Sequence, residues 1–184
     1  MGSSDFVSLE ASSFQLEKIV NFRPKIAVIL NFSSNHLDRY NGMQDYLAAK
    51  KRIFLNQDSS DYLVLNYDDS AIRGLSREAR SRAIYFRKVE GLNPNQSAVL
   101  AVASVLGIKR DIVLKVFGEF KGVEHRMENV AEIAGVKFIN DSKATTIDAT
   151  IWALNSIPSS AVLITGGREK GNDYGLISKL VGKK

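Results

Sequence analysis

Apolar positions along this chain form short runs that alternate with stretches of helical spacing. Residues 25–31 and 62–66 are continuous apolar runs with polar neighbours, which is typical of strands buried on both faces of a parallel sheet. Residues 5–9 and 161–165 also read as strands. Residues 13–20, 43–55, 95–106 and 111–120 have the spacing of helices. This alternation predicts an α/β fold with a parallel, doubly wound sheet.

A second unit is predicted to begin near Gly122. Residues 128–133 and 136–140 read as a hairpin around Ala134 and Gly135, and the helix that follows places Ile147, Ile151 and Leu154 on one face. We therefore divide the chain into residues 1–121 and residues 122–184.

Composition narrows the class of protein. The 184 residues include no cysteine, which excludes disulfides and thiolate metal sites and fits a reducing cytoplasm. No apolar run approaches the roughly 20 residues of a membrane-spanning helix, so we expect no membrane insertion. The net charge is +5, but the basic residues are scattered along the sequence, and a groove that collects small anions explains the charge as well as nucleic acid does. We expect no nucleic-acid partner.

The most informative segment is 136–146, Val-Lys-Phe-Ile-Asn-Asp-Ser-Lys-Ala-Thr-Thr. Its apolar run stops at Asn140, and Asp141, Ser142 and Lys143 follow before a helical pattern begins. Ligands of open α/β sheets bind where buried strands end, so these side chains are candidates for a binding site. An ordinary turn with a helix cap is the alternative.

Lys50 is the clearest physical signal elsewhere. On a helical wheel it lies near the centre of an apolar stripe formed by Met43, Tyr46, Ile53 and Phe54. A lysine so placed is either held in a site, with a perturbed or modified amine, or extends along the stripe to solvent.

Five other residues have chemistry that suits nucleotides and metals. Glu10 and Ser12 could provide oxygen ligands to Mg²⁺, although a helix cap with a nearby acid has the same pattern. His36 could be a metal ligand or a solvated loop residue. Arg126 could bind a phosphate or form an ion pair between the two units. Lys170, in a glycine-rich loop, is a plausible anion contact.

Taken together and in order, the motifs of this chain resemble those of the Mur ligase family, and most closely its D-glutamate-adding branch. The matching motifs are Ser-Ser-Phe-Gln-Leu-Glu at 12–17, Asn-His-Leu-Asp-Arg-Tyr at 35–40, Ala-Ala-Lys at 48–50, His-Arg-Met-Glu at 125–128, Asn-Asp-Ser-Lys-Ala-Thr at 140–145, and Gly-Gly with Lys-Gly and Asp-Tyr between 166 and 174.

The resemblance implies part of a central domain of the P-loop type with a parallel sheet, followed by part of a Rossmann-like C-terminal domain. It also implies a cytoplasmic ligase, monomeric when complete, that uses ATP and Mg²⁺ to join D-glutamate to UDP-N-acetylmuramoyl-L-alanine in peptidoglycan synthesis.

The resemblance also implies residue roles. Glu10, Ser12 and His36 would hold Mg²⁺ with a carbamylated Lys50, and Lys50, His36 and Lys143 would be the catalytic residues. Arg126, Asp141 and Asn93 would contact ATP. Lys143 would also handle the phosphate and the incoming D-glutamate, together with the side chains of Ser142, Thr145 and Lys170.

The sequence departs from the family pattern in ways that affect activity. The phosphate-binding motif Gly-x-x-x-x-Gly-Lys-Ser/Thr occurs nowhere in it. Asn93 and Pro94 stand where the family has His-Asn, and the β-rich segment that the family has after Phe86 is missing. We therefore expect a piece of a ligase that is inactive by itself. Alternatives are another amide ligase of the superfamily, such as a sibling enzyme or a folylpolyglutamate synthase, and a non-catalytic remnant that binds anions.

Overall fold

The computed structural model describes residues 5–33, 39–167 and 173–181, and it divides the chain into two compact units. Unit 1 comprises Met1–Phe32 with Tyr40–Phe117, and unit 2 comprises Ser33–Arg39 with Gly118–Lys184. The boundary predicted from the sequence lies four residues further along, between residues 121 and 122. Each unit has its own architecture.

Unit 1 is built on a parallel sheet of three strands, β1 (Ile26–Ile29), β2 (Tyr62–Asn66) and β3 (Arg82–Phe86), which lie in the order β1-β2-β3. In this register Val64 lies between Val28 and Ile84. The central strand is buried on both faces, as its continuous apolar sequence predicts. The predicted parallel α/β sheet is confirmed.

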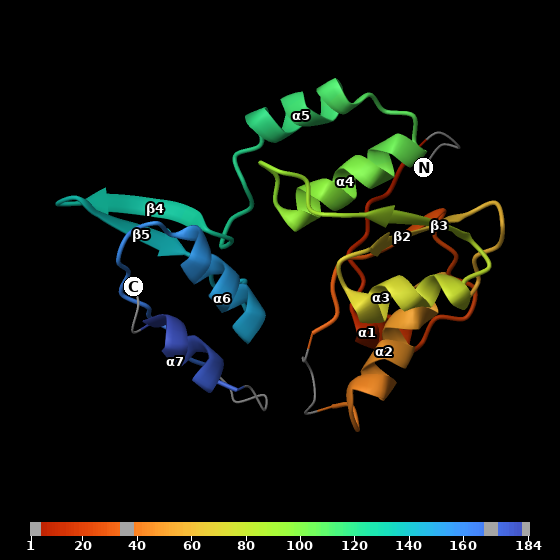
Figure 1. The fold of residues 1–184 in the computed structure, drawn as a ribbon, viewed down its shortest axis with the longest axis horizontal. Coiled ribbons are helices and arrows are strands. Elements are labelled where there is room, and N and C mark those ends of the chain that lie inside the picture. The colour runs from red at the N-terminus through yellow and green to blue at the C-terminus, as the bar shows by residue number, and fades with distance from the viewer. Residues whose placement is uncertain (1–4, 34–38, 168–172, 182–184) are drawn as a thin grey trace. The chain divides into compact units, whose positions relative to one another are not determined.

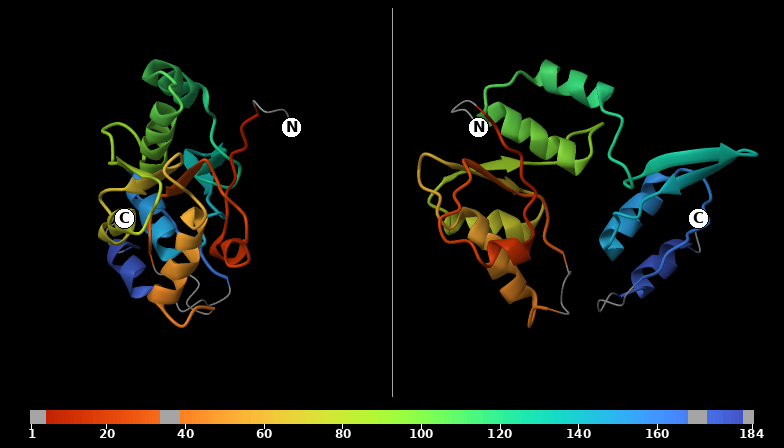
Figure 2. Two further views of the ribbon diagram at one scale, coloured as in Figure 1. Left: turned by 90° about the vertical axis from the view of Figure 1, so that its right-hand side faces the viewer. Right: turned by 180° about the vertical axis from the view of Figure 1, so that it is seen from behind.

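Helices cover both faces of this sheet (Figure 1, Figure 2). On one face, Phe54, Ile72 and Leu75 surround Leu63 and Leu65 of β2. These three side chains come from the short helix η1 (Arg52–Phe54) that continues α2 (Met43–Lys51), from α3 (Ser70–Arg73) and from η2 (Gly74–Arg77).

On the other face, Ala98 of α4 (Pro94–Val105) packs with Val64 and Phe86. Helix α5 (Arg110–Glu119) follows α4, and the short helix α1 (Ser13–Leu16) precedes β1. The sheet is therefore covered on both sides, and its polar chemistry is confined to the strand ends and edges.

Unit 2 contains an antiparallel hairpin of β4 (Glu128–Ile133) and β5 (Val136–Asn140), followed by α6 (Ile147–Ser156) and α7 (Gly175–Val181). The turn residues Ala134 and Gly135 have φ of 52° and 78°. Two successive positive φ values give the turn a twist that matches that of the strands. The predicted hairpin and the helix after it are confirmed.

Three predicted elements differ in the structure. Residues 5–9 and 161–165 form no strand, because neither pairs with another strand in the described part of the chain and extended backbone without such a ladder is not a strand. The helix predicted over 13–20 ends at Leu16. Within the described ranges, no helix has the length and apolar character needed to cross a membrane.

Candidate functional site

Lys50 occupies the half-buried position on α2 that its place in the apolar stripe predicts. The Tyr46 side chain one turn earlier is buried, and the Lys50 Nζ lies 5.0 Å from the centre of its ring. Burial lowers the pKa of the Lys50 amine, because an ammonium loses solvation there. Cation–π contact with Tyr46 favours the charged form, but loss of water dominates. The amine is therefore easier to deprotonate than that of a surface lysine.

The Tyr46 ring beneath this lysine belongs to an aromatic cluster that was not predicted from the sequence. Tyr46 lies 5.3 Å, between ring centres, from both Phe32 and Tyr40, and Tyr40 stacks on Phe14 at 6.0 Å. The Tyr40 hydroxyl donates a hydrogen bond to Glu17 Oε1 at 2.5 Å. Phe14 comes from α1, Phe32 from the segment after β1, Tyr40 from the segment before α2, and Tyr46 from α2, so the ring beneath Lys50 packs against other aromatic side chains.

Two of the other candidate metal ligands, Glu10 and Ser12, lie in the described part of unit 1. Ser12 caps α1: its hydroxyl accepts the N–H of Gln15, and the Gln15 side chain bonds back to the Ser12 N–H at 2.8 Å. Glu10 is exposed. His36 lies outside the described residues. Among the residues that the structure describes, no three His, Cys, Asp or Glu side chains group closely enough to hold a metal.

Arg52 connects the segment that carries Ser12 to the helix that carries Lys50. Its Nε and Nη2 donate to the carbonyls of Leu16 and Ile19, at 2.8 and 2.7 Å. The end of α1 is thereby fixed to the end of α2. A hydroxyl, an exposed carboxylate and a partly desolvated lysine are brought to neighbouring elements.

In unit 2, the structure brings two sequence motifs into one site. The Lys143 N–H donates to the carbonyl of His125 at 3.0 Å, and the Met127 N–H donates to Asp141 Oδ1 at 3.0 Å. His125 and Met127 have φ of 64° and 49°, in the left-handed region that residues with a Cβ rarely adopt. Arg126 lies between these two strained residues, so the strain and the two bonds fix its backbone beside the end of β5.

A polar ring that was not predicted from the sequence supports this loop. Glu128 Oε2 accepts the His125 N–H at 2.8 Å, and Asn140 Nδ2 lies 2.8 Å from His125 Nδ1. Asn140 Oδ1 accepts the Ser142 N–H at 3.1 Å. The signal that could have predicted the ring was the spacing of His125 and Glu128, three residues apart in a motif where only Arg126 was given a role.

The side chains around this ring face solvent and are largely cationic or hydroxylic. Arg126, Ser142, Lys143 and Thr145 are exposed, while Thr146 caps α6 by accepting the Ala149 N–H. Such a set suits a phosphate or carboxylate group. Of the other predicted residues, Lys170 lies outside the described ranges. Asn93 is in unit 1, where its side chain caps α4 by accepting the Gln96 N–H at 2.8 Å.

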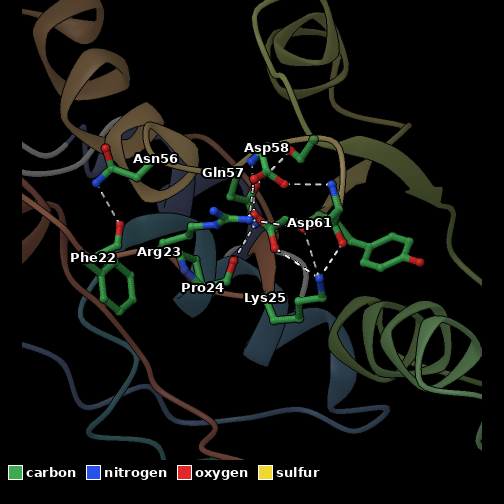
Figure 3. Close-up of polar contacts among 11 residues, drawn as sticks. Phe22, Arg23, Pro24, Lys25, Asn56, Gln57, Asp58 and Asp61 are labelled. Atoms are coloured by element: carbon green, nitrogen blue, oxygen red, sulfur yellow. Dashed lines mark hydrogen bonds and ion pairs between the residues drawn. The ribbon is translucent and has the colours of Figure 1, made fainter.

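A third polar cluster lies at the opposite end of the unit 1 sheet, where the strands begin (Figure 3). The buried Asp61 carboxylate accepts hydrogen bonds from Arg23 Nε at 2.7 Å, the Asp58 N–H at 3.0 Å and Lys25 Nζ at 3.3 Å. Burial acts to raise the pKa of Asp61, but these donors outweigh it and hold the pKa at about 2. Because every one of these donors comes from the protein itself, we interpret this cluster as structural.

Fold and site together define an α/β protein whose polar chemistry lies at strand ends, with a loop of exposed cationic and hydroxyl side chains in a second unit. Comparison with known proteins is specific: residues 1–122 match the family described as Mur ligase middle domain. The chain belongs to the Mur ligase family.

Curated relatives of the chain share one enzyme name. A protein of Pelodictyon phaeoclathratiforme named UDP-N-acetylmuramoylalanine--D-glutamate ligase is 38% identical over 231 residues, covering 100% of this chain and 50% of its own length. A protein of Pelotomaculum thermopropionicum with the same name is 38% identical over 218 residues, covering 100% of this chain and 48% of its own. The chain thus spans about half the length of the curated relatives it matches.

Solved structures agree on the fold. The crystal structure of MurF from Acinetobacter baumannii matches 73% of this chain and 37% of its own, with a TM-score of 0.62 and 17% identity. At that identity the likeness supports the fold alone.

Proposed function

We propose that this chain carries two half-sites of a ligase that joins D-glutamate to UDP-N-acetylmuramoyl-L-alanine at the expense of ATP. The observation that carries the proposal is the match over the whole chain, at 38% identity, to relatives named for that reaction. The anion-binding loop of unit 2 supports it, because both ATP and D-glutamate bring anionic groups to such a site.

The proposed chemistry is a phosphoryl transfer followed by acyl transfer. The substrate carboxylate attacks the γ-phosphorus of ATP, which gives an acyl phosphate and ADP. The amine of D-glutamate then attacks the acyl carbon, a C–N bond forms, and inorganic phosphate leaves with the C–O bond electrons. The protein forms no covalent bond to the reactants in this scheme, so positioning and charge neutralisation would supply most of the rate acceleration.

Residues of unit 2 would have the following roles in this scheme. Arg126 and Asp141 would contact ATP, with Arg126 neutralising phosphate charge. Lys143, Ser142, Thr145 and Lys170 would hold the transferred phosphate and the D-glutamate carboxylates. Lys143 is a catalytic residue in this proposal because its ammonium would meet the oxygens that gain charge.

In unit 1, Lys50 would react with CO₂: the neutral amine forms an N–C bond, a proton is released, and a carbamate results. Burial lowers the pKa of Lys50 and so favours the neutral amine that this step requires. The carbamate would hold Mg²⁺ with Glu10, Ser12 and His36. Bound there, Mg²⁺ would neutralise phosphate charge.

We expect the 184 residues alone to have no ligase activity. They lack the phosphate-binding motif, and Asn93 already uses its side-chain oxygen to cap α4, so it is weakly placed to serve the adenine. ATP- and D-glutamate-dependent phosphate release by the purified chain, followed colorimetrically, would overturn this part.

The branch is tested by ligand binding to the intact chain. We expect D-glutamate to shift the backbone NMR signals of Lys143 and Thr145, whereas L-alanine, lysine, meso-diaminopimelate and folates leave them unchanged. Preference for another amino acid would assign the chain to a sibling enzyme, and a response to folates would assign it to a folylpolyglutamate synthase.

Activity is tested by transferring the unit 2 site. We would replace the segment that matches residues 123–146 in the Pelodictyon phaeoclathratiforme ligase by the segment of this chain. The chimera should keep D-glutamate-dependent phosphate release, and Lys143→Ala in it should lower kcat by about 100-fold or more. A folded but inactive chimera, with Lys143→Ala making no further difference, would show that these residues do not serve the reaction.

A further inference from the structure

Although basic residues occur throughout the sequence, one segment of unit 1 has a marked excess of them over acidic residues. Residues 73–88 contain six basic side chains and one acidic one, a net charge of +5, which equals the net charge of the whole chain. All six are exposed: Arg73, Arg77, Arg80, Arg82, Arg87 and Lys88. The acidic residue, Glu78, is already paired with Lys51 at 2.5 Å.

This segment contains β3, and β3 has an open edge in the described part of the sheet. The Arg82 N–H donates to the Asp61 carbonyl on the β2 side, and the Phe86 carbonyl accepts from Tyr67 on that same side. Because backbone groups alternate along a strand, the N–H and C=O groups of Ala83 and Tyr85 point to the outer edge. Those groups can pair with an added strand.

Guanidinium groups near both ends of β3 are held by stacking on rings of β2 and of the residue that follows β2. Arg82 Cζ lies 5.8 Å from the centre of the Tyr62 ring, at the beginning of β3. Beyond its end, Arg87 and Arg73 lie over Tyr67 at 3.8 and 4.8 Å. The nearby Asp68 carboxylate accepts the Lys88 backbone N–H at 3.3 Å. The positive groups are thus ordered before any partner arrives, which reduces the entropy lost on binding.

We propose that the outer edge of β3 binds an acidic, extended peptide segment of a partner protein, which adds to the sheet as a fourth strand. Backbone hydrogen bonds to Ala83 and Tyr85 would supply affinity, and the arginines would select acidic sequences. This inference is independent of the ligase reaction, since it uses none of the residues assigned to it.

Two other occupants fit the edge less well. Nucleic acid bases need open aromatic faces on which to stack, but arginines already cover Tyr62 and Tyr67. A second copy of the chain would place arginine against arginine or lysine in either strand direction, because both ends of the edge are basic.

The test is a binding titration of the intact chain with a fluorescent octapeptide of alternating glutamate and valine, followed by anisotropy. The matching lysine–valine peptide and a short oligothymidylate are the comparison probes. We expect saturable binding of the glutamate peptide that weakens with salt, and no binding of the lysine peptide. Tighter binding of the oligothymidylate would overturn the proposal in favour of nucleic acid.

Two variants separate strand addition from simple charge attraction. Tyr85→Pro removes the edge N–H and should weaken peptide binding about tenfold, whereas Tyr85→Val keeps it and should bind as the parent does. Arg87→Gln with Lys88→Gln keeps the edge but removes charge, and should weaken binding by a similar factor. If Tyr85→Pro, shown to be folded by circular dichroism, binds as tightly as Tyr85→Val, the peptide is not a strand and the proposal fails.

Discussion

Two charged side chains of unit 1 illustrate how burial separates a structural residue from a reactive one. Asp61 is buried, but three donors from its own unit surround its carboxylate, so its charged form is stabilised. Lys50 is half-buried, and its ammonium lies over the face of an aromatic ring. The first arrangement stabilises the fold. The second leaves an amine whose charge is weakly compensated, and it is this lysine that a ligand or a modification would stabilise.

Asp61→Asn should destabilise unit 1 by about 2 kcal/mol, because charge-assisted hydrogen bonds from Arg23 and Lys25 are weakened and the new amide places donors against donors. The free energy of unfolding from urea titrations measures the effect. Asp58→Asn is the matched control: its carboxylate is half-exposed and pairs with the same Arg23, so a much smaller loss is expected. Equal losses in the two variants would contradict a special role for Asp61.

The contribution of Asp61 to stability should also depend on pH. The folded-state pKa of Asp61 is about 2, below its ordinary value of 3.8, so the folded state binds this proton less readily than the unfolded state does. Its contribution to stability is therefore complete above about pH 4 and is lost as the pH falls through 2. Urea titrations at a series of pH values should show the stability difference between parent and Asp61→Asn shrinking over that interval. A difference that stays constant down to pH 2 would argue against the lowered pKa.

At the scale of elements, the sequence predicts best where local rules and the fold agree. The hairpin β4–β5 has its turn residues in place, and its bounds were predicted as observed. Helix α4 begins at a capping box formed by Asn93 and Gln96, a signal that lies within the chain segment itself. Residues 5–9 and 161–165 have the composition of strands, but a strand also requires a neighbour, which composition cannot provide.

In the candidate site, too, features set by local sequence were predicted and features set by tertiary contacts were not. Asn140, Asp141, Ser142 and Lys143 were found because they follow an apolar run. Arg126 of the partner loop was proposed from its own chemistry, but the shape of that loop was not predicted, since positive φ at His125 is set by hydrogen bonds to Glu128 and Lys143 that form only in the folded unit. The aromatic cluster around Lys50 depends on contacts between three elements and could not be predicted from spacing.

Substitutions of Thr145 and Thr146 can distinguish a residue that caps a helix from one that contacts a ligand. Thr146→Ala should reduce the stability of unit 2 by about 1 kcal/mol, because the Ala149 N–H loses its acceptor at the start of α6. Thr145→Ala should leave stability unchanged but weaken the NMR response to D-glutamate. Chemical denaturation followed by Trp152 fluorescence measures the first effect. If Thr145→Ala destabilises the unit as much as Thr146→Ala, Thr145 has a structural role instead.

At the scale of the molecule, the candidate residues fall into two separate units. The aromatic cluster with Lys50 belongs to unit 1, and the loop of Arg126 and Asp141 belongs to unit 2. The proposed reaction uses both, with Lys50 assigned to the metal and the loop of unit 2 to the nucleotide. Whether the two units fold independently therefore determines whether a change in one site also affects the other.

That independence can be measured because Trp152, in α6, is the single tryptophan of the chain and reports on unit 2. Circular dichroism at helix wavelengths reports on both units. If each unit has its own core, the two urea transitions should not coincide, and Asp61→Asn should shift the circular dichroism curve while leaving the tryptophan curve in place. Thr146→Ala should shift the tryptophan curve. Superimposable curves that move together in both variants would mean that the two units unfold as one cooperative body, and each half-site would then depend on the stability of the other.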